Sequence, residues 1–144
     1  MRKKLLNLYF KLTIPAFLII AILFGIDKIV ASIRLFNCSR IFSFILMFVA
    51  LLFAFVIPFW YRLTFINKWK KLVEDKKYEE KAFLFEKNFL IMPLLTPYIM
   101  ILSFIVGVDR IPMIIIILLS LYSVYYYYPS VRRINLEKRI FKVE

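Results

Sequence analysis

Four long apolar stretches restrict what this chain can fold into more than any other feature of its sequence. They cover about residues 8–26, 41–61, 89–108 and 111–128. About 20 predominantly apolar helical residues cross the roughly 30 Å hydrocarbon core of a bilayer. The stretches lack the strict alternation of barrel strands, and a helix satisfies its backbone hydrogen bonds within one segment. We therefore predict an all-α integral membrane protein with four transmembrane helices.

Composition and length agree with this prediction. The chain has 144 residues, of which 63% are hydrophobic, whereas soluble domains are usually about 45–50% apolar. This length suits one domain, so we predict a single four-helix membrane domain over residues 1–144. No small-residue cleavage pattern follows Ile26, so the first stretch is predicted to be a span rather than a cleaved signal peptide.

Lys and Arg are divided unevenly between the two sides of the predicted spans. Of the 21 such residues, 17 lie before or early in the first span, in segment 62–88, or in the tail 129–144. Cytoplasmic loops of membrane proteins carry an excess of Lys and Arg. We therefore predict that both termini are cytoplasmic. The abundance of Lys, Ile and Phe is typical of AT-rich bacterial genomes, which favours a bacterial inner (plasma) membrane.

The net charge of +12 is accounted for mainly by this orientation, so nucleic acid is not an expected partner. Basic segments at a cytoplasmic membrane face attract anionic lipids. We expect the bilayer, including its anionic lipids, to contact these segments.

Segment 62–88, between the second and third spans, has an amphipathic pattern. Its apolar residues recur at helical spacing: Phe65, Ile66, Trp69, Leu72 and Val73. A basic amphipathic helix of this kind is typical of the membrane interface, and the same face suits a partner protein. We predict an amphipathic cytoplasmic helix over about 63–75, which contacts lipid, a partner or both. The tail 129–144 is predicted to include a second basic, moderately amphipathic helix.

Two segments resemble each other at an offset of 82 residues. Residues 15–29 read PAFLIIAILFGIDKI, and residues 97–111 read PYIMILSFIVGVDRI. The chain has only 2 Gly, so the shared Gly-x-Asp-cation block does not arise from apolar bias. We predict two tandem, pseudo-repeated helical hairpins related by an axis along the membrane normal, with chance similarity as the alternative. Pro15 and Pro97 are expected to kink the matched helices.

The repeat places six matched residues near the outer ends of the first and third spans: Gly25, Asp27, Lys28, Gly107, Asp109 and Arg110. The glycines are expected to allow close backbone approach. The residues act as interface anchors and turn formers, or they flank a small outward-facing site on the pseudo-symmetry axis.

Hydroxyl groups are the main polar groups within the predicted spans. We expect them to bond to their own helix or to link helices. They belong to Thr13, Ser43, Thr96, Ser103, Ser120 and Ser123. Tyr9, Tyr122 and the run 125–128 lie near the predicted cytoplasmic interface, where we expect an aromatic belt rather than a site for a quinone or aromatic ligand.

The sequence lacks the residues of most catalytic sites. It has no His and a single Cys, Cys38, which excludes His-ligated zinc and Ser–His or Cys–His pairs. Each Asp of the repeat precedes a cation, which favours the ionised carboxylate over a proton-sharing Asp pair. No acid lies within the spans, where a coupled transporter needs one. We therefore predict no enzyme, cofactor or metal site.

These exclusions favour a membrane protein that acts by contact. We expect an accessory, assembly or regulatory subunit that meets another membrane protein at the cytoplasmic face. The alternative is an uncoupled channel or a lipid or small-molecule transport protein that acts as a homo-oligomer.

Overall fold

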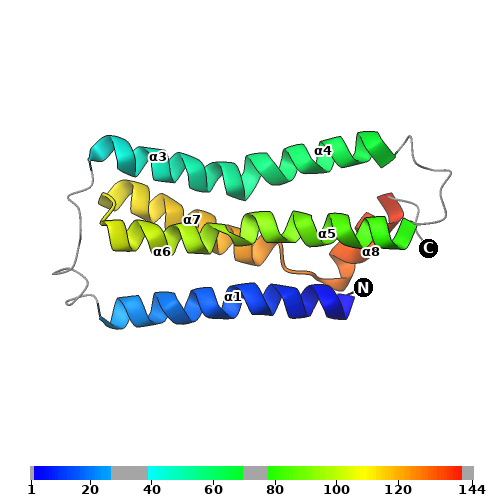
Figure 1. Ribbon diagram of the computed structural model, residues 1–144, viewed down its shortest axis with the longest axis horizontal. Coiled ribbons are helices and arrows are strands. Elements are labelled where there is room, and N and C mark those ends of the chain that lie inside the picture. Colours follow the sequence, from blue (N-terminus) through cyan, green and yellow to red (C-terminus); the bar gives the residue numbers. More distant parts are fainter. Residues whose placement is uncertain (1, 27–38, 70–77, 141–144) are drawn as a thin grey trace.

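The computed structural model describes residues 2–26, 39–69 and 78–140. Of these residues, 91% are helical and none forms a β-strand, which confirms the all-helical prediction. The helices are α1 (Arg2–Gly25), α3 (Arg40–Leu51), the π-helix η1 (Leu52–Val56), α4 (Ile57–Trp69), α5 (Tyr78–Leu94), α6 (Thr96–Val106), α7 (Arg110–Tyr126) and α8 (Val131–Ile140) (Figure 1).

Three helical segments in the described residues are long and apolar enough to cross a membrane. They are Lys3–Gly25, Arg40–Lys68 and Glu80–Val106. A fourth is counted if α7 and α8 form one span that is bent by 76°. α7 alone has 17 residues, the lower limit of the range of about 17–25 for a span. These three to four candidate spans are consistent with a membrane protein.

The long helices run back and forth along the long axis of the molecule (Figure 1). At one end, α1 begins, α4 ends and α5 begins. α8 lies at the same end, which we call the α8 end. At the opposite end, α1 ends, α3 begins and α6 turns into α7.

The tightest helix packing involves α3, α6 and α7. α7 packs against both α3 and α6, whereas α1 packs against α5 and α6. The core between α3 and α7 includes Leu46, Ala50 and Ile116. Ala50 is fully buried, and such small side chains let helices approach closely. α1 is more peripheral, because 17% of its most apolar window is buried against 50% for Glu80–Val106.

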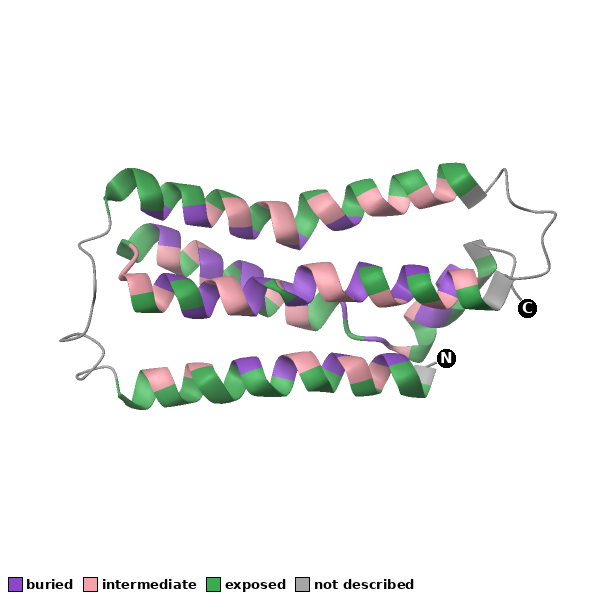
Figure 2. Cartoon of the chain, viewed as in Figure 1, coloured by how far each residue is buried: buried purple, intermediate pink, exposed green. Residues whose placement is uncertain are grey.

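Many large apolar side chains lie on the outer surface of the bundle, whereas the small hydroxyl side chains of the spans lie inside. Phe48, Leu18 and Leu118 are examples of exposed residues, each close to 60% exposed. Figure 2 shows exposed positions along the outer sides of α1 and α3. All six span hydroxyl residues named above are buried. Because a membrane solvates apolar surfaces and helix contacts there use small and polar residues, this distribution is consistent with a bilayer.

Five of these six hydroxyl groups form hydrogen bonds of the predicted kinds. Thr13 and Ser103 each donate to the carbonyl four residues earlier, at 2.9 and 2.7 Å. Two further bonds link helices: Asp109 N donates to Ser43 Oγ at 3.3 Å, and Ser123 Oγ donates to Thr96 Oγ1 at 3.5 Å.

The π-helix η1 lies in the middle of the second candidate span, directly before Pro58. Pro58 has no N–H, so it cannot bond to the Ala54 carbonyl four residues earlier. The Tyr127 hydroxyl donates to this carbonyl at 3.3 Å instead. A bond from the end of α7 thus satisfies the backbone group that the proline leaves free.

The helices differ from the sequence predictions at two places. The segment predicted as a separate amphipathic helix continues without a break from the second span as far as Trp69, and residues 70–77 lie outside the described part. The third span is interrupted at Leu95, between Pro93 and Pro97, and α6 starts at Thr96. α1 is one continuous helix with Pro15 inside it, and the kink expected there stays a prediction.

Candidate contact surface at the α8 end

A buried ion cluster joins α8 to α5. Arg133 Nη2 lies 3.5 Å from Glu86 Oε2, and Arg133 Nε lies 3.5 Å from Glu137 Oε1. Glu86 is 3% exposed and Glu137 is 5% exposed. Buried carboxylates are unfavourable unless they are paired. We refer to these three residues as the Arg133 cluster.

The Arg133 guanidinium also binds the backbone at the C-terminal end of α7. Its Nη1 donates to Tyr127 O at 2.8 Å, a carbonyl at the C-cap of α7. Its central carbon lies 5.2 Å from the centre of the Phe89 ring and 5.5 Å from that of Tyr127. Both distances fall within the limit of about 6 Å for a cation–π contact. One side chain therefore connects α5, the end of α7 and α8.

The local sequence explains why α8 turns back toward α5. Pro129 follows α7 and cannot continue its hydrogen bonds. Ser130 then caps the next helix, because its Oγ accepts a hydrogen bond from Arg133 N at 3.2 Å. Glu137 lies four residues after Arg133 and therefore on the same face of α8.

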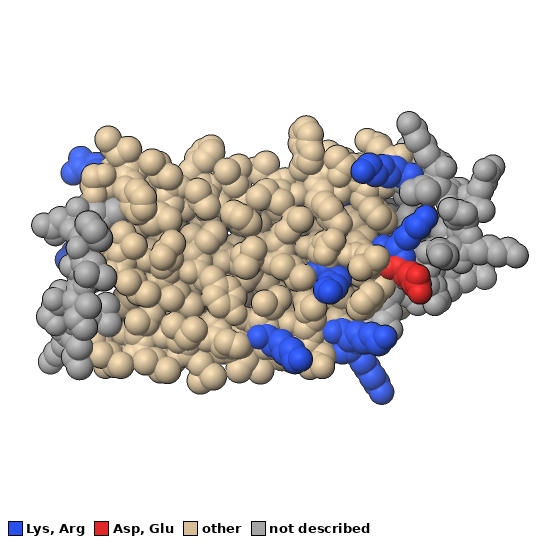
Figure 3. Space-filling view, viewed as in Figure 1, with Lys and Arg blue, Asp and Glu red and all other residues tan. Residues whose placement is uncertain are grey.

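Burial removes more negative than positive charge from the surface of this end. The carboxylates of Glu86 and Glu137 are buried with Arg133. Glu80, by contrast, is an exposed carboxylate of this end. Figure 3 shows Lys and Arg gathered at the α8 end and an uncharged band between the two ends. Among the side chains that the structure describes, the exposed cations of this end are Lys3, Lys4, Lys11, Lys68, Arg132 and Arg139.

The predicted contact face of segment 62–88 is partly used inside the chain. Phe65 stacks on Phe85 of α5 with ring centres 4.0 Å apart, and Ile66 packs against the same buried cluster. Trp69 is the last residue of α4. Leu72 and Val73 lie outside the described residues. The first two residues of this face therefore attach α4 to α5.

The predicted outer-face site lies at the opposite end and is described only in part, since Asp27 and Lys28 lie outside the described residues. Gly107 ends α6 in the left-handed conformation, with φ of 78°. Gly25 does not have the expected close contact, because a Cβ there would meet nothing within 4 Å. Asp109 and Arg110 are exposed. Within the described residues, His, Cys, Asp and Glu form no group of three that could hold a metal.

The tyrosines near the α8 end divide into two groups. Tyr125 is 87% exposed and Tyr126 is 53% exposed, and for these the aromatic belt stays a prediction. Tyr9 and Tyr127 are each 5% exposed and do not fit a belt. The Tyr9 hydroxyl donates to Val124 O of α7 at 2.7 Å. These two side chains link helices.

The Arg133 cluster is not predicted from the sequence. The spacing of Arg133 and Glu137 is a recognisable helical ion pair, but such a pair is usually exposed. Nothing in the spacing indicates that Glu86, 47 positions before Arg133, completes the cluster from another helix.

Comparisons of the chain with models of protein families, with curated proteins and with solved structures found no match.

Proposed function

We propose that this chain is a small polytopic membrane protein without catalytic machinery, in a bacterial inner membrane with both termini cytoplasmic. It acts as an accessory, assembly or regulatory subunit, and it contacts an acidic partner through the α8 end. This proposal rests on the burial of Glu86 and Glu137 at an end where the exposed charges of the described residues are mainly cations.

The outward side of α8 is suited to such a contact. Arg132, Leu136 and Arg139 are exposed, while Glu137 is held inside by Arg133. Complementary charge steers association and favours one class of partner over another. A carboxylate on the outward side of α8 would repel an acidic partner. The Arg133 cluster keeps two carboxylates away from this surface.

Co-purification from the host membrane tests this proposal. The tagged chain is extracted in mild detergent, and native mass spectrometry identifies any stoichiometric second polypeptide. The variant Arg132→Glu/Arg139→Glu should lose that polypeptide, because both substitutions reverse exposed charges on α8. The control Arg40→Glu/Arg110→Glu reverses two exposed charges at the opposite end and should retain it.

Two results oppose the proposal. Equal loss of the second polypeptide in both double variants would indicate a general charge effect. A homo-oligomer with bound lipid and no second polypeptide would favour the uncoupled channel or lipid-transport alternative.

A further inference from the structure

An apolar groove runs along α1 where this helix faces the end of α7. It has a volume of about 450 Å³, and its walls include Phe10, Ile14, Phe17 and Leu18 of α1 and Val124 of α7. This volume is in the range of about 300–1,000 Å³ that is typical of ligand sites. Tyr9 closes one side, because its hydroxyl is bonded to Val124 O. The groove is open along its length to the surroundings of the bundle.

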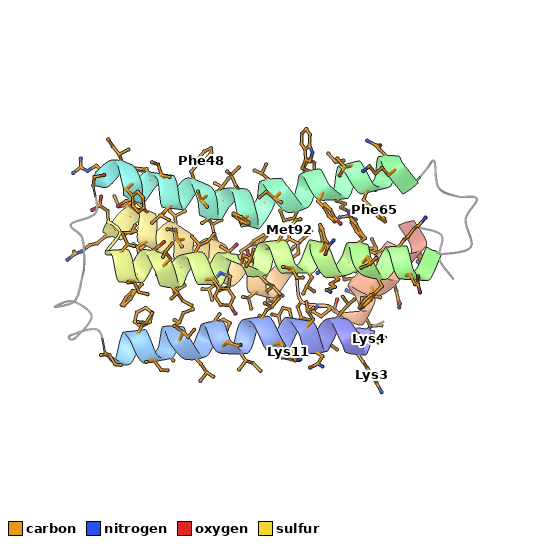
Figure 4. The ribbon with its side chains drawn as sticks, viewed as in Figure 1. Lys3, Lys4, Lys11, Phe48, Phe65 and Met92 are labelled. Atoms are coloured by element: carbon orange, nitrogen blue, oxygen red, sulfur yellow. The ribbon has the colours of Figure 1, made fainter. Side chains whose placement is uncertain are left out.

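Two lysines on α1 lie in line with this groove. Lys3 precedes Phe10 by seven residues, and Lys11 precedes Leu18 by seven, so each lies on the same helix face as a groove residue. Both lysines are exposed, and Figure 4 shows them on the half of α1 nearer the α8 end. α1 carries no carboxylate. The groove therefore continues into a positively charged surface.

The position of Lys11 is a second, independent indication that an anion binds here. Lys11 lies within the candidate span Lys3–Gly25, about 12 Å along the helix from Lys3 at 1.5 Å per residue. A charge within a span is normally paired or extends to the interface. Lys11 has no ion pair with a carboxylate among the described residues. An anion at the membrane surface would supply the missing charge.

We propose that this groove binds one anionic phospholipid. An acyl chain lies along Phe10, Phe17 and Val124, and the phosphate lies between Lys3 and Lys11. The site requires insertion in a membrane but no protein partner, so it does not depend on the contact proposed for α8.

Native mass spectrometry of the purified full chain tests the site. The chain is reconstituted in vesicles that contain phosphatidylglycerol and phosphatidylcholine in equal amounts with identical acyl chains. We expect phosphatidylglycerol to be retained in preference to phosphatidylcholine. In Lys3→Gln/Lys11→Gln this preference should fall about 30-fold, since each nearby cation contributes about 1 kcal/mol, a factor of about five.

Two further variants separate the groove from general lipid contact. Ala21 also lines the groove and is exposed, so Ala21→Phe should reduce retention of both lipids by filling it. Ile45 lies in a depression of about 440 Å³ that is lined by α3 alone, and Ile45→Phe should have no effect. Lys68→Gln, at the end of α4, is the control for loss of an exposed cation at the α8 end and should leave the preference unchanged.

Three outcomes overturn the proposal. The first is equal retention of the two lipids by the unmodified chain. The second is an equal loss of preference in Lys68→Gln and Lys3→Gln/Lys11→Gln. The third is that the unmodified chain forms a dimer in place of binding lipid, and that this dimer is lost in Ala21→Phe. The groove would then bind a second copy of the chain.

Discussion

At the residue scale, the two glycines of the repeat have different structural roles. Gly107 has a φ of 78°, which costs an L-residue roughly 1–2 kcal/mol. Gly25 is helical, and a Cβ there meets nothing within 4 Å. We expect Gly107→Ala to lower the free energy of unfolding by about 1 kcal/mol, whereas Gly25→Ala raises it by about 0.5 kcal/mol. Thermal unfolding in detergent measures both. A loss of stability in Gly25→Ala would instead indicate the close helix contact expected from the sequence.

A second prediction at this scale concerns the tyrosine run. Tyr127→Phe removes the hydroxyl that bonds to Ala54 O beside Pro58 and leaves a buried carbonyl without a donor. The expected loss of stability is about 1–3 kcal/mol. Tyr125→Phe is the matched control, because Tyr125 is 87% exposed, and it should change stability by less than about 0.5 kcal/mol. Equal effects in chemical or thermal unfolding would contradict the proposed role of the Tyr127 hydroxyl.

Hydrogen bonds of single side chains could be predicted from the sequence where they depend only on neighbouring residues of the same helix. Thr13 and Ser103 bond within their own helices, as expected of hydroxyls in an apolar span. Tyr9 and Tyr127 were misassigned to an aromatic belt because their burial depends on helices far away in the sequence. Tyrosine is a residue type that is typical of membrane interfaces, but the sequence of the run 125–128 does not indicate which of its rings faces inward.

At the element scale, Arg133 joins α8 to α5 and to the end of α7. We expect Arg133→Gln to destabilise the chain by about 3–5 kcal/mol, because it removes the cation that is paired with two buried carboxylates. Arg132→Gln, at the neighbouring exposed position, should change stability by less than about 0.5 kcal/mol. Thermal unfolding compares the two variants.

The coupling between α5 and α8 can be measured directly. Adding Glu86→Gln to Arg133→Gln should recover part of the lost stability, because it removes one of the uncompensated carboxylates. No recovery in the double variant would mean that the 3.5 Å pair of Arg133 and Glu86 does not carry the attachment of α8.

The existence of the helices could be predicted from the sequence, but their interruptions could not. Long apolar runs indicate helices, and Pro129 indicates a stop after α7. The break at Leu95 and the continuation of α1 past Pro15 depend on packing, since neighbouring helices decide whether a proline bends or ends a span. Likewise, the amphipathic stripe of segment 62–88 indicates a helix, but Phe65 is partly covered by α5.

At the scale of the whole molecule, the face shown in Figure 3 has its charged side chains near the two ends and an uncharged band between them. The sequence predicts this division through the positions of Lys and Arg. It does not predict that Glu86 and Glu137 are buried, which leaves a surface richer in cations than the sequence of the α8 end suggests. Salt should therefore weaken binding of the α8 end to an acidic partner or an anionic membrane, because ions screen exposed charges beyond about 8 Å at physiological ionic strength.

Labelling of single cysteines in intact cells tests the proposed orientation, in which the bundle spans the membrane and its α8 end faces the cytoplasm. Cys38 is the only cysteine of the chain and lies in the loop predicted to be outside. A membrane-impermeant maleimide should label Cys38 in intact cells. In a Cys38→Ser background, Lys68→Cys should react only after the membrane is permeabilised. Labelling of Lys68→Cys in intact cells, with Cys38 protected until permeabilisation, would contradict the account.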